Sequence, residues 1–268
     1  SGLIDGQGGN GIELGGASTI TGGISNVGTI LGGAGDGINI NVDSEVFGGI
    51  KNTGLISGSS DGIDFDDANV DFFGGITNTG TIQGGSSSGI EWQGHIFNGG
   101  IANNAGGTIS GANGIMMDNG TFNGGIANAS GATILGNGTA AIYLNGVTFT
   151  NDIVNSGLIS GISSADGIRM SSGTFSGTIT NNTTGTISAS GLGADGIEIA
   201  GGTFSNGIFN HGTIVSGTSN GIYIHGAAIF GGGISNDGTI HAESRGIYIV
   251  NTGGFTGGIT NDGLIVTD

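Results

Sequence analysis

The chain has 268 residues, of which 65 are Gly and none is Pro or Cys, and its formal net charge is −17. Only three residues are basic, which argues against nucleic acid and anionic membranes as partners because binding phosphate groups requires Lys and Arg. The missing Cys excludes disulfides and thiolate chemistry, and the apolar runs are too short for a membrane-inserted helix.

In chain order, the sequence repeats one unit that contains three short segments expected to be extended. One copy reads Thr29-Ile30, then Gly37-Ile38-Asn39-Ile40, then Val46 through Asn52. Small and turn-forming residues separate the segments, and no helical spacing competes with them. In the second segment, alternation sends the two apolar residues to one face and the residue between them to the other. This alternation places Trp92 in the core.

The third segment reads Phe-x-x-x-Ile-x-Asn, and its spacing is the same in all ten copies. Ile20 and Val46 replace the Phe in the two earliest copies. We expect the aromatic rings to stack in the core and the Asn amides to form an inward hydrogen-bonded ladder. The aromatic positions are Phe72, Phe97, Phe122, Phe149, Phe175, Phe204, Phe230 and Phe255. The ladder positions are Asn26, Asn52, Asn78, Asn103, Asn128, Asn155, Asn181, Asn210, Asn236 and Asn261.

A repeat of this kind predicts an all-β fold, a right-handed parallel β-helix with about ten rungs of 24–29 residues. Three segments per rung predict a three-sheet solenoid. We expect residues 1–268 to form a single β-helix repeat domain. Because the chain starts and stops at the same point of the repeat, we also expect it to be a fragment of a longer chain.

The runs GGITNTGTIQGG at 74–85 and GGISNDGTIHAESRGIYI at 232–249 give this repeat a recognisable form. They resemble the Gly-Ile-x-Asn-x-Gly-Thr-Ile repeats in passenger regions of bacterial autotransporters, and the resemblance covers essentially the whole chain. It implies a secreted right-handed β-helix displayed on the cell by a C-terminal outer-membrane barrel. Such passengers include adhesins, self-associating proteins and a few enzymes.

Acidic residues gather in the rungs around the second segment at Asp64. Asp64 and Glu91 are expected to be outward neighbours on adjacent rungs, where two carboxylates repel each other. With Asp66, Asp67 and Asp71 they form a candidate Ca²⁺ site, since Ca²⁺ binds six to eight oxygens. The alternative is a solvated acidic face without metal. A separate set of Asp residues precedes the Gly of Gly-Ile, and we interpret it as turn-forming; it comprises Asp36, Asp61, Asp166 and Asp195.

Other outward residues suggest ion pairing or sugar binding. Arg169 lies between Tyr143 and Glu198 on neighbouring rungs, which predicts an ion pair with a cation–π contact. Tyr223 and Tyr248 are adjacent and form a candidate platform for a sugar ring. The four His residues are dispersed and make no zinc-binding pattern. The short turns offer few walls for a catalytic cleft, so we assign no catalytic residue and no certain cofactor.

The sequence therefore favours a non-enzymatic, extracellular stalk or fibre segment of a secreted surface protein that mediates adhesion or self-association. Its expected partners are other copies of itself, or a glycan or protein of a cell surface. One alternative is a polysaccharide-active β-helical enzyme, a lyase or glycoside hydrolase, that uses Asp64, Asp66, Asp67 and Glu91. Another is a filament subunit that stacks end to end.

Overall fold

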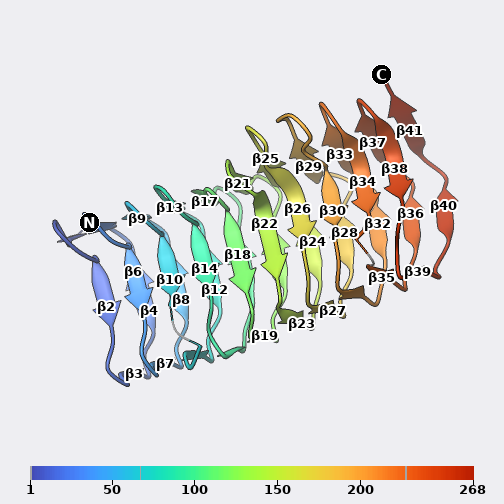
Figure 1. Ribbon diagram of the computed structural model, residues 1–268. Coiled ribbons are helices and arrows are strands. Elements are labelled where there is room, and N and C mark those ends of the chain that lie inside the picture. The colour runs from blue at the N-terminus through green and yellow to red at the C-terminus, as the bar shows by residue number, and fades with distance from the viewer. Residues whose placement is uncertain (1, 67, 227) are drawn as a thin grey trace.

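The computed structural model describes residues 2–66, 68–226 and 228–268, and these residues form strands and turns with no helix. The strands wind into an elongated solenoid with the two termini at opposite ends (Figure 1). Four parallel sheets run along the rod, one with eleven strands and three with ten strands each. The predicted parallel β-helix of about ten rungs is thereby confirmed.

Each of the four sheets contains every fourth strand of the chain. The first sheet consists of β1 (Leu3–Asp5), β5 (Thr29–Gly32), β9 (Leu55–Gly58), β13 (Thr81–Gly84), β17 (Thr108–Gly111), β21 (Thr133–Gly136), β25 (Leu158–Gly161), β29 (Thr186–Ala189), β33 (Thr213–Ser216), β37 (Thr239–Ala242) and β41 (Leu264–Thr267). The second consists of β2 (Ile12–Leu14), β6 (Ile38–Ile40), β10 (Ile63–Phe65), β14 (Ile90–Trp92), β18 (Ile115–Asp118), β22 (Ala140–Asn145), β26 (Asp166–Met170), β30 (Ile197–Ile199), β34 (Asn220–Ile224) and β38 (Arg245–Ile249).

The third and fourth sheets are built from shorter strands. The third consists of β3 (Thr19–Ile20), β7 (Glu45–Val46), β11 (Asp71–Phe72), β15 (Ile96–Phe97), β19 (Thr121–Phe122), β23 (Thr148–Phe149), β27 (Thr174–Phe175), β31 (Thr203–Phe204), β35 (Ile229–Phe230) and β39 (Gly254–Phe255). The fourth consists of β4 (Ile24–Asn26), β8 (Ile50–Asn52), β12 (Ile76–Asn78), β16 (Ile101–Asn103), β20 (Ile126–Asn128), β24 (Ile153–Asn155), β28 (Ile179–Asn181), β32 (Ile208–Asn210), β36 (Ile234–Asn236) and β40 (Ile259–Asn261).

The prediction of three sheets is wrong, because the third segment of each repeat forms two strands. In one rung, β7 ends at Val46 and β8 begins at Ile50, and Gly49 between them has a φ of 74°. L-residues with a side chain rarely adopt this backbone conformation. A Cβ at Gly49 would also lie 2.5 Å from the carbonyl oxygen of Gly75 in the next rung. The glycines thus make a sharp corner where the sequence pattern suggested one extended segment.

Register between rungs places equivalent residues directly over one another. Ile56 of β9 pairs with Ile30 of β5 on one side and Ile82 of β13 on the other, for example. Neighbouring strands are about 4.8 Å apart, so ten rungs extend roughly 48 Å. The columns of Ile, Phe and Asn seen in the sequence are therefore physical columns along the rod.

The Phe column forms a continuous stack inside the rod, as predicted. Ring centroids of successive residues lie 4.6 to 5.4 Å apart from Phe72 to Phe255. The rings are nearly parallel from Phe122 onward and tilted before it. The tilt occurs where Phe65 and Trp92 also occupy the core, with Trp92 edge-on to Phe97. Trp92 is fully buried, as the alternation predicts.

The Asn ladder is confirmed over its full length. Each Asn side-chain nitrogen from Asn26 to Asn236 donates to the side-chain oxygen of the next Asn at 2.7 to 3.0 Å. The same nitrogen donates to a backbone carbonyl of the next rung, as from Asn128 to Leu158 at 3.0 Å. The amides at the inner positions are therefore buried but keep their hydrogen bonds. A buried amide without hydrogen bonds would destabilise the fold.

Candidate functional site

Two clusters of buried carboxylates lie along the second sheet, on its strands and on the residues that lead into those strands. The Asp64 cluster consists of Asp36, Asp61 and Asp64, and the Arg169 cluster contains Asp166, Asp195 and Glu198 around that guanidinium. In each, the three acidic side chains offer oxygens that lie within 4.8 Å of one another. All six carboxylates are less than 9% exposed.

The Asp residues that directly precede Gly-Ile help to position the Asp64 cluster. Asp36 Oδ1 accepts a hydrogen bond from the backbone N–H of Asp61 at 2.9 Å. Asp61 Oδ1 accepts one from the N–H of Ser88 at 2.6 Å, one rung further on. The prediction that the Asp residues before Gly-Ile form turns is wrong for Asp166, which begins β26, and none of them has a positive φ; each instead ties its rung to the next. The same bond recurs where the N–H of Asp195 donates to Asp166 Oδ1 at 2.7 Å and where the N–H of Asn220 donates to Asp195 Oδ1 at 2.8 Å.

Asp64 comes from β10, where it occupies the position between the two core residues Ile63 and Phe65. Its Oδ2 accepts a hydrogen bond from Asn39 Nδ2 at 3.1 Å, and the same nitrogen donates to Asp36 Oδ2 at 2.9 Å. Its Oδ1 is buried and finds no hydrogen-bond partner within the described part of the chain. Burial, followed by the charges of Asp61 and Asp36, raises the pKa of Asp64 to about 9.

Glu91 extends this acidic region by one rung. It pairs in register with Asp64, as predicted, and is 8% exposed. Its Oε2 accepts hydrogen bonds from the hydroxyls of Ser87 at 2.9 Å and Ser88 at 3.1 Å. Burial, and then the charge of Glu91, raises the pKa of Asp61 to about 7. The interpretation of Asp64 and Glu91 as a solvated acidic face is wrong, because both side chains are buried.

Among the described residues of the predicted calcium site, Asp66, Asp71 and Glu91 do not join Asp64 in its carboxylate cluster. Asp71 belongs to β11 of the third sheet, where its Oδ1 lies 3.2 Å from Nδ1 of His95. Asp66 lies close enough to raise the pKa of Asp64 through its charge. Asp67 lies outside the described residues. The structure instead brings Asp64 together with Asp36 and Asp61, which sequence reasoning had assigned to turns alone.

The Arg169 cluster carries its own positive charge. Nη1 of Arg169 lies 3.2 Å from Asp166 Oδ2 and also contacts Glu198 Oε2, which confirms the predicted ion pair with Glu198. Nε2 of His225 lies 2.7 Å from Glu198 Oε1. Burial, and then a side-chain hydrogen bond with Glu198 that favours the protonated form, raises the pKa of Asp166 to about 8. Burial, and then the charge of Arg169, lowers the pKa of His225.

Aromatic side chains form two stacks on the outside of the rod. Tyr223 and Tyr248 stack with ring centroids 5.1 Å apart, and Arg245 lies 4.3 Å above the ring of Tyr248. Phe47 and Phe73 form a second stack at 4.8 Å, which the sequence analysis missed. These two are 45% and 36% exposed. Each Phe directly follows the buried last residue of its strand, β7 or β11. Both rungs read Phe-Gly-Gly at this point, and this repeat could have predicted the stack from the sequence.

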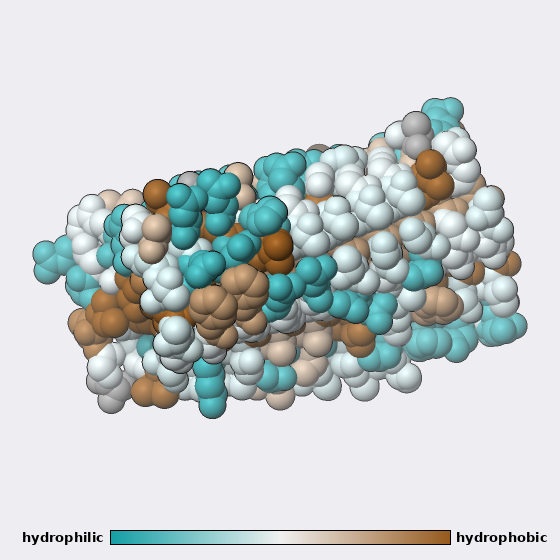
Figure 2. All heavy atoms as spheres, turned by 90° about the horizontal axis from the view of Figure 1, so that it is seen from below, coloured by the Kyte–Doolittle hydropathy of each residue, from teal (hydrophilic) through white to brown (hydrophobic). Residues whose placement is uncertain are grey.

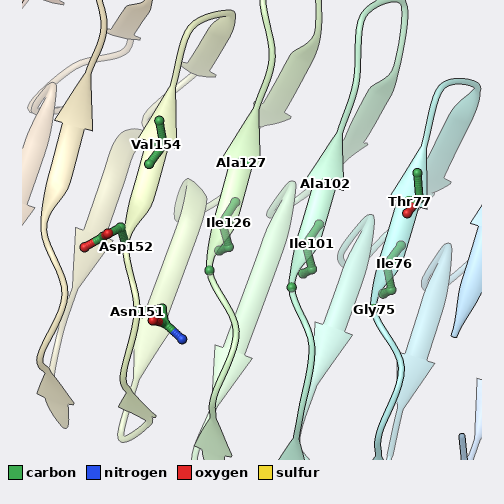
Figure 3. A pocket seen from close by; sticks show the side chains of 12 residues that line it. Gly75, Ile76, Thr77, Ile101, Ala102, Ile126, Ala127, Asn151, Asp152 and Val154 are labelled. Atoms are coloured by element: carbon green, nitrogen blue, oxygen red, sulfur yellow. The ribbon is translucent and has the colours of Figure 1, made fainter.

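Figure 2 shows the molecule from below, relative to Figure 1. Much of this face has intermediate hydropathy, and the apolar patches on it are most frequent towards the N-terminal end. A groove of about 510 Å³ runs across the outer side of four strands of the fourth sheet, β12, β16, β20 and β24. Its floor has small side chains, among them Ala102 and Ala127, and Asn151 and Asp152 lie at the β24 end (Figure 3).

No known protein family, curated protein or solved structure matches this chain. Within the three described ranges, no helix is long and apolar enough to cross a membrane. The fold and its hydrogen bonds define the class of the protein: a repeating parallel β-solenoid with an internal Asn ladder.

Proposed function

We propose that the chain is a non-enzymatic, extracellular β-solenoid, a stalk or fibre segment of a secreted surface protein that mediates adhesion or self-association. One observation carries the proposal: the Asn ladder passes from Asn26 to Asn261 without a missing bond. A rod in which every rung is fixed to the next transmits force and holds a binding surface away from its support.

The composition supports an extracellular role. A net charge of −17 keeps a rod soluble, and a chain without Cys needs no disulfide formation after secretion. The resemblance of the Gly-Ile-x-Asn-x-Gly-Thr-Ile runs to autotransporter passengers agrees with display on a bacterial surface. The groove over Ala102 and Ala127 provides a contact surface for a linear glycan or an extended peptide.

The proposal is tested on intact cells of the organism that makes the protein. Antibodies raised against residues 1–268 should label unpermeabilised cells, and deletion of the gene should reduce surface attachment or cell clumping. Purified protein should release no reducing ends from neutral or acidic polysaccharides. Turnover that disappears in Asp64→Asn would overturn the proposal in favour of an enzyme, and labelling only after permeabilisation would overturn the location.

A further inference from the structure

The two carboxylate clusters are built from equivalent positions of the repeat. Asp36 and Asp61 correspond to Asp166 and Asp195, since each precedes the Gly of Gly-Ile. Asp64 corresponds to Glu198, because each lies between the two core residues of its strand. By the same alignment, Asn39 occupies the position of Arg169. The clusters therefore differ mainly in what bridges their carboxylates.

The bridging geometry is similar in the two clusters, but the charge is not. Arg169 Nη1 contacts Asp166 Oδ2 and Glu198 Oε2. Asn39 Nδ2 contacts Asp36 Oδ2 and Asp64 Oδ2. An amide supplies a hydrogen donor without a positive charge. The other two basic side chains lie elsewhere, Lys51 exposed on β8 of the fourth sheet and Arg245 over Tyr248.

Asp64 marks the point at which the first cluster lacks the positive charge that Arg169 gives to the second. The side chain is 8% exposed, and its buried Oδ1 has no hydrogen-bond partner among the residues that the structure describes. Buried polar atoms are almost always paired, and a carboxylate oxygen in this state is costly unless an ion or a proton satisfies it. Oxygens of Asp36 and Asp61 lie within 4.8 Å of an Asp64 oxygen. Oxygens that bind one Ca²⁺, each about 2.4 Å from it, lie no more than about 4.8 Å apart, so this spacing lets all three side chains reach the same ion.

We propose that Asp36, Asp61 and Asp64 bind one hard divalent cation, with Ca²⁺ as the best fit, and that this ion supplies the positive charge that Arg169 supplies in the second cluster. Oxygen-only ligands favour Ca²⁺ or Mg²⁺ over transition metals, and a buried site favours Ca²⁺ because Mg²⁺ retains more of its water. The bound ion fixes β6 to β10 by joining side chains from two rungs. The proposal is independent of the surface role described above.

The test is the thermal stability of the purified chain at pH 8, measured in EDTA, in CaCl₂ and in MgCl₂ at a fixed ionic strength. Ca²⁺ should raise Tm by about 5 °C at saturating concentration. Asp64→Asn should remove this shift. Asp71→Asn, which loses the same charge from the third sheet, should retain it. Calorimetric titration with CaCl₂ should give a stoichiometry near one for the parent chain.

A reciprocal exchange makes the test more stringent. Asn39→Arg should raise Tm in EDTA and abolish the response to Ca²⁺, because the guanidinium then neutralises the cluster. Arg169→Asn should make the second cluster responsive to Ca²⁺. If the larger side chain at position 39 prevents folding, Asp64→Asn decides the question. The proposal is overturned by a parent chain that shows neither a Ca²⁺ shift nor heat of binding, or by an equal shift in Asp64→Asn.

Discussion

At the scale of single residues, the acidic clusters show what a sequence pattern can and cannot place. The adjacency of Asp64 and Glu91 was predictable because equivalent positions of neighbouring rungs pair in register. The participation of Asp36 and Asp61 was not, because an Asx-Gly dipeptide predicts a turn without predicting where its side chain points. Their carboxylates reach the N–H of the next rung, so they lie beside Asp64.

The pKa of Asp166 makes stability depend on pH. Burial raises this pKa from the ordinary Asp value of 3.8 to about 8, so between these values the folded state holds more protons than the unfolded state. Stability from this group is therefore present below pH 4 and is lost as pH rises through 8. We expect the Tm of Asp166→Asn, relative to the parent chain, to increase by roughly 5 °C between pH 5 and pH 9.

The matched control for this prediction is Asp262→Asn, which alters an exposed carboxylate of the same chemical type. Its Tm should follow that of the parent across the same pH range. Parallel pH profiles for Asp166→Asn and the parent chain would contradict the assignment of the raised pKa to Asp166.

At the scale of the element, the Ile, Phe and Asn columns were predictable, whereas the division into four sheets was not. Identical positions in every repeat place Phe on Phe and Asn on Asn once the strands are parallel and in register. The corner between β7 and β8 depends on the left-handed backbone at Gly49. Gly is abundant throughout the repeat, so its presence alone did not mark which glycine would turn the chain.

The ladder is tested at Asn128, in the middle of the rod. Its Oδ1 accepts from Asn103 at 3.0 Å, and its Nδ2 donates to Asn155 at 2.9 Å. Asn128→Leu leaves polar groups of both neighbouring rungs with fewer partners and should destabilise the fold by about 2–4 kcal/mol. Asn128→Ser retains a hydroxyl and should be milder. Denaturant unfolding measures both.

The control for the ladder variants is Asn137→Leu, which changes the same side chain in an exposed turn. It should alter the free energy of unfolding by less than about 0.5 kcal/mol. If all three variants unfold at the same denaturant concentration as the parent, the ladder does not stabilise the rod.

At the scale of the whole molecule, the chain is a stack of coupled rungs. Each rung contacts its neighbours through four parallel strand pairs, the Phe stack and the Asn ladder. Solenoids of this kind gain stability from nearest-neighbour interfaces, so the rungs should yield one after another under load. The overall architecture was predictable because repetition constrains every rung in the same way. The partner of the rod was not, since the outward residues vary from rung to rung.

Stretching single molecules between the two chain ends tests the proposed mechanical role most directly. The stacked rungs should resist force and then rupture in succession, each step releasing about one rung of roughly 26 residues, or about 90 Å of extended chain. Extension along the curve of an unstructured polymer, with no rupture steps, would contradict the proposal that the rod resists force.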